Sequence, residues 1–116
     1  MLTDSPSKSN RTVLVVEDAD TCATLLEVAI LLIPGVDVAF AESGQEALHY
    51  LADGRRVSAL VTDLNMPRGD GFELIARVRA DRRFAGLPII VVSGDTNPET
   101  PKRVLLLGVD AFFAKP

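Results

Sequence analysis

Short runs of β-branched and aliphatic residues alternate with helical segments along almost the whole chain of 116 residues. The apolar runs predict five strands, at residues 13–16, 36–40, 57–62, 89–92 and 110–114. The segments between them predict four helices, at residues 20–33, from 43 to 54, from 69 past 78, and 97–107. Strands that alternate with helices favour a parallel sheet with right-handed crossovers, so the sequence predicts an α/β fold.

Local signals mark several of the predicted helix ends. Asp20 is placed to cap the first helix, and Ser43 with Glu46 has the spacing of a capping box. Gly54 and Gly108 follow the second and fourth helices, where glycine commonly ends a helix. These signals support the predicted order of elements.

Composition bounds the class of protein. Hydrophobic residues make up 47% of the chain, enough for one sizeable core, and the formal net charge of -4 argues against a general binder of nucleic acid or anionic membranes. Cys22 is the only cysteine, so no intramolecular disulfide can form, and a cytoplasmic location is expected. Residues 1–10 contain no apolar run and are expected to be a mobile tail, which leaves residues 11–116 as one domain.

The longest nearly uninterrupted apolar stretch runs from Leu25 to Ile33 and is broken only by Glu27. It is too short to span a bilayer, because a membrane helix needs about 20 apolar residues. We therefore expect it to form a buried helix.

Polar residues follow four of the five predicted strands, at the point where each strand ends. They are Glu17, Asp18, Asp63, Ser93 and Lys115. The carboxyl ends of parallel strands meet at one edge of a sheet, where open α/β sheets bind their ligands. The sequence therefore predicts three carboxylates, one hydroxyl and one ammonium in the same crevice.

The acidic residues of this set are suited to a hard cation. Oxygen ligands with room for water favour Mg²⁺ or Mn²⁺, and the backbone carbonyl of Asn65 could add a further oxygen. The alternative for the same residues is structural: Asp18 would cap a helix, and Asp63 to Asn65 would form a turn. Both interpretations are compatible with the acidic residues alone.

Asp63 is also placed to act as a nucleophile, since a carboxylate can attack phosphorus to give an acyl phosphate. Lys115 would neutralise oxygens of the transferred group, and Ser93 could donate a hydrogen bond to one of them. Phe112 could change rotamer when the Ser93 hydroxyl moves, or it could simply be a core residue.

Other polar residues have ordinary interpretations. His49, the only histidine, is expected to be a solvated helix residue. The arginines at positions 77, 79, 82 and 83 are expected to form a solvated helix face, or at best a patch for docking a partner.

Four motifs together resemble the receiver domain of bacterial two-component response regulators. They are Val-Leu-Val-Val-Glu-Asp ending at Asp18, Val-Thr-Asp-Leu-Asn-Met-Pro followed by Asp70-Gly71, Val-Val-Ser-Gly ending at Gly94, and Gly-Val-Asp-Ala-Phe-Phe-Ala-Lys-Pro from Gly108. The resemblance covers about residues 11–116. It implies a flavodoxin-like, doubly wound, five-stranded parallel sheet in the order 2-1-3-4-5.

The resemblance also implies roles for individual residues. Asp63 would be the phosphoacceptor, with Mg²⁺ held directly by Asp18, mostly through water by Glu17, and by the carbonyl of Asn65. The phosphoryl donor would be a phosphohistidine of a partner histidine kinase or histidine phosphotransfer protein. Phosphorylation would then switch an interaction surface, so we expect a signalling switch rather than a turnover enzyme.

Ser93 would be the switch hydroxyl, Lys115 the phosphate-pairing lysine, and Phe112 the switch aromatic, without the hydroxyl of a tyrosine. Members of the family continue beyond the position of Pro116 into a fifth helix. We expect that helix to be absent from this chain and an output domain or a dimer partner to be possible contacts. The helix at 97–107 carries Pro98 and Pro101, so an altered signalling surface is also expected.

Two alternatives belong to other functional classes. A phosphatase of the haloacid-dehalogenase type would need a second aspartate two residues after Asp63, where this chain has Asn65. An interaction module that works without phosphorylation would have the same fold, but such domains usually lack an acidic residue or the lysine of the set. The sequence does not name the cognate kinase or the output.

Overall fold

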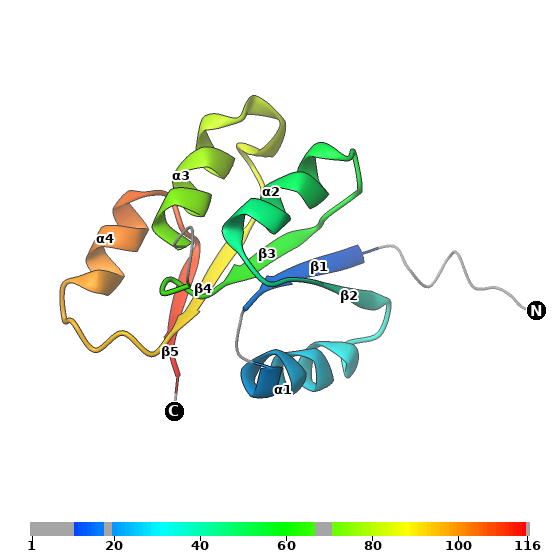
Figure 1. The fold of residues 1–116 in the computed structure, drawn as a ribbon, viewed down its shortest axis with the longest axis horizontal. Coiled ribbons are helices and arrows are strands. Elements are labelled where there is room, and N and C mark those ends of the chain that lie inside the picture. Colours follow the sequence, from blue (N-terminus) through cyan, green and yellow to red (C-terminus); the bar gives the residue numbers. More distant parts are fainter. Residues whose placement is uncertain (1–10, 18–19, 67–70, 116) are drawn as a thin grey trace, which may run out of the picture.

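The computed structural model describes residues 11–17, 20–66 and 71–115, with the backbone alone for residues 20–25. Five parallel strands form one sheet in the order β2-β1-β3-β4-β5 (Figure 1). The strands are β1 (Arg11–Val16), β2 (Val36–Ala41), β3 (Ala59–Thr62), β4 (Ile89–Ser93) and β5 (Ala111–Ala114). The predicted fold class and strand order are confirmed. The predicted tail at 1–10 and the predicted ligand Asp18 lie outside the described residues, as do Asp70 and Pro116.

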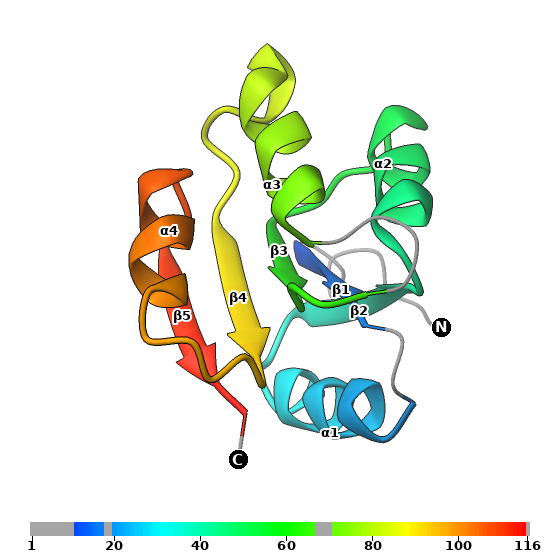
Figure 2. The same cartoon turned by 60° about the vertical axis from the view of Figure 1, so that its left-hand side comes forward.

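Four α-helices and one short 3-10 helix lie within the described residues. They are α1 (Asp20–Leu31), α2 (Gly44–Ala52), α3 (Gly71–Ala80), η2 (Arg82–Phe84) and α4 (Thr100–Leu106). Figures 1 and 2 show α1 on one face of the sheet and α2, α3 and α4 on the other. This arrangement follows from the strand order, because the chain moves outward from β1 to β2 and then back past β1 to β3, and right-handed crossovers in opposite directions lie on opposite faces.

The main core lies between the sheet and the face covered by α2, α3 and α4. Alternate residues of a strand point to the same face, and in β4 these are the buried Ile89, Val91 and Ser93. Helix α3 contributes Leu74, Ile75 and Val78, spaced as one helical stripe. The other large side chains that are fully buried in the cluster are Leu14, Val16, Leu60, Leu64 and Val104.

The capping signals of α2 are confirmed. The Ser43 hydroxyl accepts a hydrogen bond from the Glu46 backbone N–H at 3.1 Å. The Glu46 carboxylate accepts from the N–H of Glu42 at 2.7 Å, one residue before the cap. Gly54 and Gly108 follow their helices with φ angles of 79° and 97°, a region that favours glycine.

Helix α4 is shorter than predicted, because it begins at Thr100 and not at Asn97. The Asn97 side chain accepts a hydrogen bond from the Glu99 backbone N–H at 2.9 Å and so stabilises a turn before the helix. The 3-10 helix η2 was not predicted. The Asp81 side chain caps it by accepting from the Arg83 N–H at 2.9 Å.

The prediction that residues 25–33 form a buried helix is wrong for its second half. Helix α1 ends at Leu31, and Leu32, in the following turn, is 79% exposed. Val28, Leu31 and Ile33 are exposed as well. The physical reason is that α1 lies by itself on its face of the sheet among the described helices, so its outer side contacts none of them (Figure 2). Within the described ranges, no helix combines the length and apolar character needed to cross a bilayer.

Candidate functional site

The sheet register brings the predicted site residues to one edge. Val16 of β1 pairs with Thr62 of β3, and the Asp63 N–H donates to the Val16 carbonyl at 3.1 Å. Glu17 and Asp63 therefore leave neighbouring strands at the same level. In the next two strands of the sheet, the Lys115 backbone N–H donates to the Ser93 carbonyl at 2.8 Å, so the carboxyl ends of β4 and β5 are also level with each other.

The Lys115 ammonium, which follows β5, reaches the carboxylates that follow β1 and β3. Its Nζ lies 2.8 Å from Glu17 Oε2 and 3.0 Å from Asp63 Oδ2. Both carboxylates are nearly inaccessible to solvent, and the lysine side chain is 19% exposed. The structure thus brings Glu17, Asp63 and Lys115 together as the sequence predicted.

Two opposing effects act on the pKa of Lys115. Partial burial works to lower the pKa, because it disfavours the charged form. Hydrogen bonds to Glu17 and Asp63, together with the attraction of the same two carboxylates, outweigh the burial and raise the pKa above its ordinary value. Lys115 is therefore a permanent cation in this site at physiological pH.

The backbone around Asp63 fixes the orientation of its carboxylate. Oδ1 accepts hydrogen bonds from the N–H groups of Leu64 at 2.7 Å and Asn65 at 3.4 Å. The Thr62 hydroxyl donates to the Asp63 carbonyl oxygen at 2.7 Å. Oδ1 thus faces the turn that follows β3, and Oδ2 faces Lys115, as expected for a preorganised reactive group.

Gly71, the first residue of α3, packs directly against this turn. Its N–H donates to the Leu64 carbonyl at 2.7 Å. A Cβ at this position would collide with the Asp63 carbonyl oxygen and lie 2.7 Å from the Leu64 Cα. Only glycine leaves room for this approach of helix to strand end. The motif that contains Gly71 does not by itself reveal this close contact with the predicted phosphoacceptor.

Ser93 and Phe112 occupy the predicted strand positions. Ser93 is fully buried, and its Oγ accepts a hydrogen bond from the Asp95 N–H at 3.1 Å. Phe112 is half-buried and packs against the main core cluster. This packing fits the interpretation of Phe112 as a core residue. The switch roles of Ser93 and Phe112 stay predictions.

The predicted metal ligands can be compared with the geometry only in part, since Asp18 lies outside the described residues. Among the residues that are described, no three His, Cys, Asp or Glu side chains form a group that could hold a metal ion. Glu17 and Asp63 nevertheless each direct one oxygen to the same point, the Lys115 Nζ. An all-oxygen donor set of this kind fits a hard cation such as Mg²⁺.

Comparison with known proteins identifies the family. The family model described as "Response regulator receiver domain" matches residues 13–116. This chain belongs to the response regulator receiver domain family. A chemotaxis protein CheY homolog of Campylobacter jejuni is 34% identical over 103 residues, which is 89% of this chain and 79% of that protein.

Solved structures of receiver domains agree with the fold. A response regulator receiver protein from Pseudomonas putida has a TM-score of 0.82 and 39% identity, covering 91% of this chain and 86% of the other. The phosphorylated cyanobacterial phytochrome response regulator RcpA has a TM-score of 0.85 and 26% identity, covering 91% and 81%. Receiver domains of this family interact with histidine kinases or phosphotransfer proteins.

Proposed function

We propose that this receiver domain accepts a phosphoryl group on Asp63 from a phosphohistidine of a partner protein. The observation that carries the proposal is the bridge made by Lys115 Nζ between Asp63 Oδ2 and Glu17 Oε2. A nearly buried carboxylate beside a permanent cation is arranged to hold an anionic group on its oxygen. The RcpA relative was crystallised in a phosphorylated form, which supports the same chemistry here.

The reaction would be a displacement at phosphorus. An oxygen lone pair of Asp63 attacks the phosphorus atom, and the P–N bond of the phosphohistidine breaks. The electron pair of that bond goes to the imidazole nitrogen, and the ring takes up one proton from solvent, so the products are an aspartyl phosphate and an unmodified histidine. Because Oδ1 is held by the backbone N–H of Leu64, the free rotation of the nucleophile is already restricted.

Lys115 and Ser93 would act on the oxygens of the transferred group. The ammonium, which binds Asp63 Oδ2 in this structure, would move to a phosphoryl oxygen and neutralise part of its charge. The Ser93 hydroxyl would donate to another phosphoryl oxygen, and Phe112 would then respond to the displacement of that hydroxyl. These movements would shift the population between two states of the β4–β5 side of the domain.

Receiver domains typically bind Mg²⁺. In this chain Glu17, Asp18, Asp63 and the Asn65 carbonyl would hold the ion, with Mn²⁺ as a substitute. When bound, the ion supplies positive charge near the phosphoryl oxygens. The protein would be a switch in a cytoplasmic signalling pathway, which could also remove its own phosphoryl group, rather than an enzyme of continuous turnover.

Intact-mass measurement after incubation with acetyl phosphate and Mg²⁺ tests the proposal. The chain should gain the mass of one phosphoryl group, and Asp63→Asn should prevent this gain. Asp53→Asn, at an exposed carboxylate beyond the end of α2, serves as the matched control and should leave the gain unchanged. A chain that gains no phosphoryl group, or a gain that survives Asp63→Asn, would contradict the proposal.

Thermal unfolding separates this function from that of an interaction module that works without phosphorylation. A ligand that binds only the folded state raises its stability by mass action. Millimolar Mg²⁺ should therefore raise the Tm of the unmodified chain, and Asp63→Asn should reduce that rise. An unchanged Tm would favour the module that needs no phosphorylation.

A further inference from the structure

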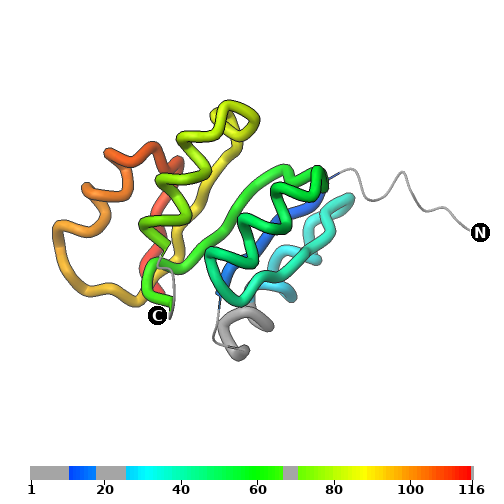
Figure 3. Tube along the Cα trace, turned by 45° about the horizontal axis from the view of Figure 1, so that its top comes forward, coloured from blue at the N-terminus to red at the C-terminus, as the bar shows by residue number. Residues whose placement is uncertain are grey.

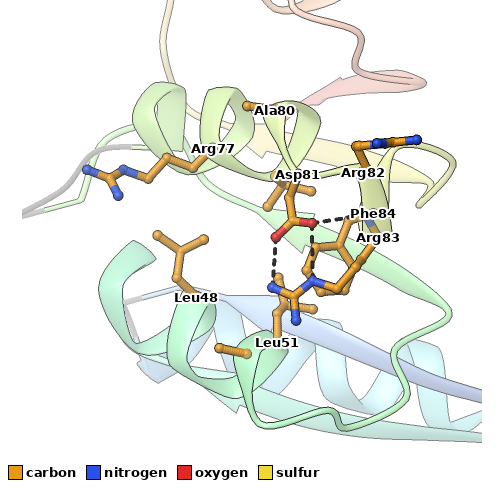
Figure 4. A pocket seen from close by; sticks show the side chains of 10 residues that line it. Leu48, Leu51, Arg77, Ala80, Asp81, Arg82, Arg83 and Phe84 are labelled. Carbon is orange, nitrogen blue, oxygen red and sulfur yellow. Dashed lines mark hydrogen bonds and ion pairs between the residues drawn. The ribbon is translucent and has the colours of Figure 1, made fainter.

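A groove lies between α2 and the end of α3, away from the Asp63 site. It has a volume of about 650 Å³. The apolar part of its lining, its floor, consists of the half-buried Leu48 and Phe84 together with Leu51 and Val78, which are only 2% and 1% exposed. Arg77, Arg82 and Arg83 also line the groove and form its rim. Helices α2 and α3 lie side by side along it (Figure 3). Figure 4 shows Arg83 reaching toward Leu51 of α2, with Arg77 and Arg82 at opposite ends.

The charge of this groove is opposite to that of the whole chain. The chain carries a formal net charge of -4, whereas the lining of the groove has three arginines and a single carboxylate, Asp81. The three guanidinium groups belong to exposed residues. A local positive rim around an apolar floor is complementary to a ligand that has both carboxylates and an apolar side chain.

The arginines can exchange their present partners for a ligand. Arg83 binds Asp81 through two hydrogen bonds, from Nε to Oδ1 at 3.1 Å and from Nη2 to Oδ2 at 2.8 Å, and Arg77 binds Glu73 at 3.2 Å. Both arginine side chains are more than 60% exposed in these pairs, and exposed ion pairs contribute little stability. A peptide carboxylate can make the same two parallel hydrogen bonds to a guanidinium group as Asp81 makes to Arg83, so it can compete for this arginine.

The position of the groove leaves the predicted phosphoacceptor accessible. The groove is formed by the ends of α2 and α3, from which the chain enters β3 and β4. It is therefore near the amino ends of these strands, whereas Asp63 follows the carboxyl end of β3. A ligand in the groove and a phosphoryl group on Asp63 can be bound at the same time.

We propose that this groove docks an acidic amphipathic peptide segment of a partner protein. An apolar side chain of the segment would occupy the floor beside Leu48, Leu51 and Phe84, and its carboxylates would bind Arg82 and Arg83. Nucleic acid fits less well, since its phosphates lack the apolar side chain and the net charge of the domain repels a long polyanion. A short peptide responds to the local rim, because charges beyond about 8–10 Å are screened at physiological salt.

Chemical-shift mapping on the whole ¹⁵N-labelled chain tests this proposal. The probe is a short synthetic peptide of glutamates and leucines placed at i, i+3 and i+4 spacing. We expect a Kd below about 1 mM, with shift changes confined to residues 48–52 and 77–84. Replacing every glutamate by lysine, or every leucine by serine, should weaken binding at least about tenfold.

Two charge-matched double variants identify the residues that bind. Arg82→Gln with Arg83→Gln removes two charges from the rim, and we expect it to weaken binding at least about fivefold. Lys102→Gln with Arg103→Gln removes two charges from exposed residues of α4 and should change the Kd by less than about twofold. Amide spectra and thermal unfolding of both variants show whether each is folded. Titration of the wild-type chain with the peptide tests the proposal even if a variant does not fold.

Several results would overturn the proposal. One is that the acidic peptide causes no change in amide shifts, or causes changes at residues outside the groove. Another is that the lysine peptide binds with the same affinity as the acidic peptide, or that the two double variants weaken binding equally. A stronger response to a single-stranded oligonucleotide or to phosphatidylglycerol vesicles would replace the peptide by nucleic acid or membrane as the partner. The Asp63→Asn variant should bind the probe as the wild-type chain does, so this test is independent of phosphorylation.

Discussion

Lys115 Nζ lies 3.0 Å from Asp63 Oδ2 although 52 residues separate the two in the sequence. The same ammonium lies 2.8 Å from Glu17 Oε2, so one cation compensates two nearly buried carboxylates. Isolated carboxylates with so little exposure would be unfavourable, because burial without a partner costs several kcal/mol per ion. The lysine therefore stabilises the fold as well as serving the proposed chemistry.

Lys115→Met should destabilise the domain at pH 7 by at least about 1 kcal/mol, because it leaves Glu17 and Asp63 without their shared cation. The deficit relative to wild type should be fully present below about pH 10 and should shrink as the pH rises further, because wild-type Lys115 then loses its proton. Urea denaturation from neutral to alkaline pH measures this change.

The sign of this pH dependence follows from the pKa of Lys115 in the wild-type chain. The pKa of Lys115 is raised by folding, so the stability that it contributes is fully present below about 10.4, the value for an unfolded lysine. That contribution is lost only as the pH rises through the higher folded value. Lys102→Met, at an exposed lysine of α4, is the control and should show no change of its stability difference from wild type at alkaline pH. Equal pH profiles for the two variants would contradict the compensation by Lys115.

Gly71→Ala should destabilise the domain by about 2 kcal/mol or more, because the new Cβ would collide with the Asp63 carbonyl oxygen. Gly86→Ala is a matched control, since a Cβ there meets nothing within 4 Å. This control should be neutral or slightly stabilising, by up to about 1 kcal/mol. Thermal unfolding of both variants checks the prediction, and a Gly71→Ala domain as stable as Gly86→Ala would refute the close contact.

Much of the edge of the sheet could be predicted from the sequence. Asp63 and Lys115 follow apolar strands, and the parallel topology alone requires strand ends to meet, so the local pattern was sufficient. The contact of Gly71 with Asp63 could not be predicted, because it depends on where the turn after β3 returns to α3. The local sequence pattern predicts where strands end, whereas packing between a loop and a helix depends on the three-dimensional path of the chain.

The exposure of α1 shows a different reason for an incorrect prediction. The apolar run from Leu25 to Ile33 suggested burial, but burial requires a neighbouring element as well as apolar side chains. Helix α1 contacts β1 and β2 and lies opposite the three other α-helices described in the structure. Its outer residue Leu31 is therefore exposed, and composition alone carries no information on that arrangement.

Ser43→Ala should destabilise the domain by about 1 kcal/mol, because it removes the oxygen that accepts the Glu46 N–H at the start of α2. Gln45→Ala changes an exposed residue of the same turn and should alter the free energy of unfolding by less than about 0.5 kcal/mol. Urea denaturation compares the two. The capping role would be refuted if the serine variant were no less stable than the glutamine variant.

Arg79 differs from its neighbouring arginines, and the prediction that it belongs to a solvated helix face is wrong. Its side chain is only 19% exposed. The guanidinium group donates to the carbonyl of Gly108 at 3.0 Å, to the carbonyl of Phe84 at 3.2 Å and to Asp110 Oδ2 at 3.2 Å. The sequence did not reveal this role, because Gly108 and Asp110 are 29 and 31 residues away.

Arg79→Ala should therefore destabilise the domain by about 1–3 kcal/mol, since three acceptors lose their shared donor. Arg77→Ala is the control on the same helix: its partner Glu73 is exposed, and the loss should stay below about 0.5 kcal/mol. Arg79→Lys should recover less than half of the deficit, because one ammonium cannot reproduce the planar fork of the guanidinium group. Urea denaturation measures the free energy of unfolding of all three variants, whose m-values should equal that of wild type. Equal losses of stability in Arg79→Ala and Arg77→Ala would contradict the bridging role of Arg79.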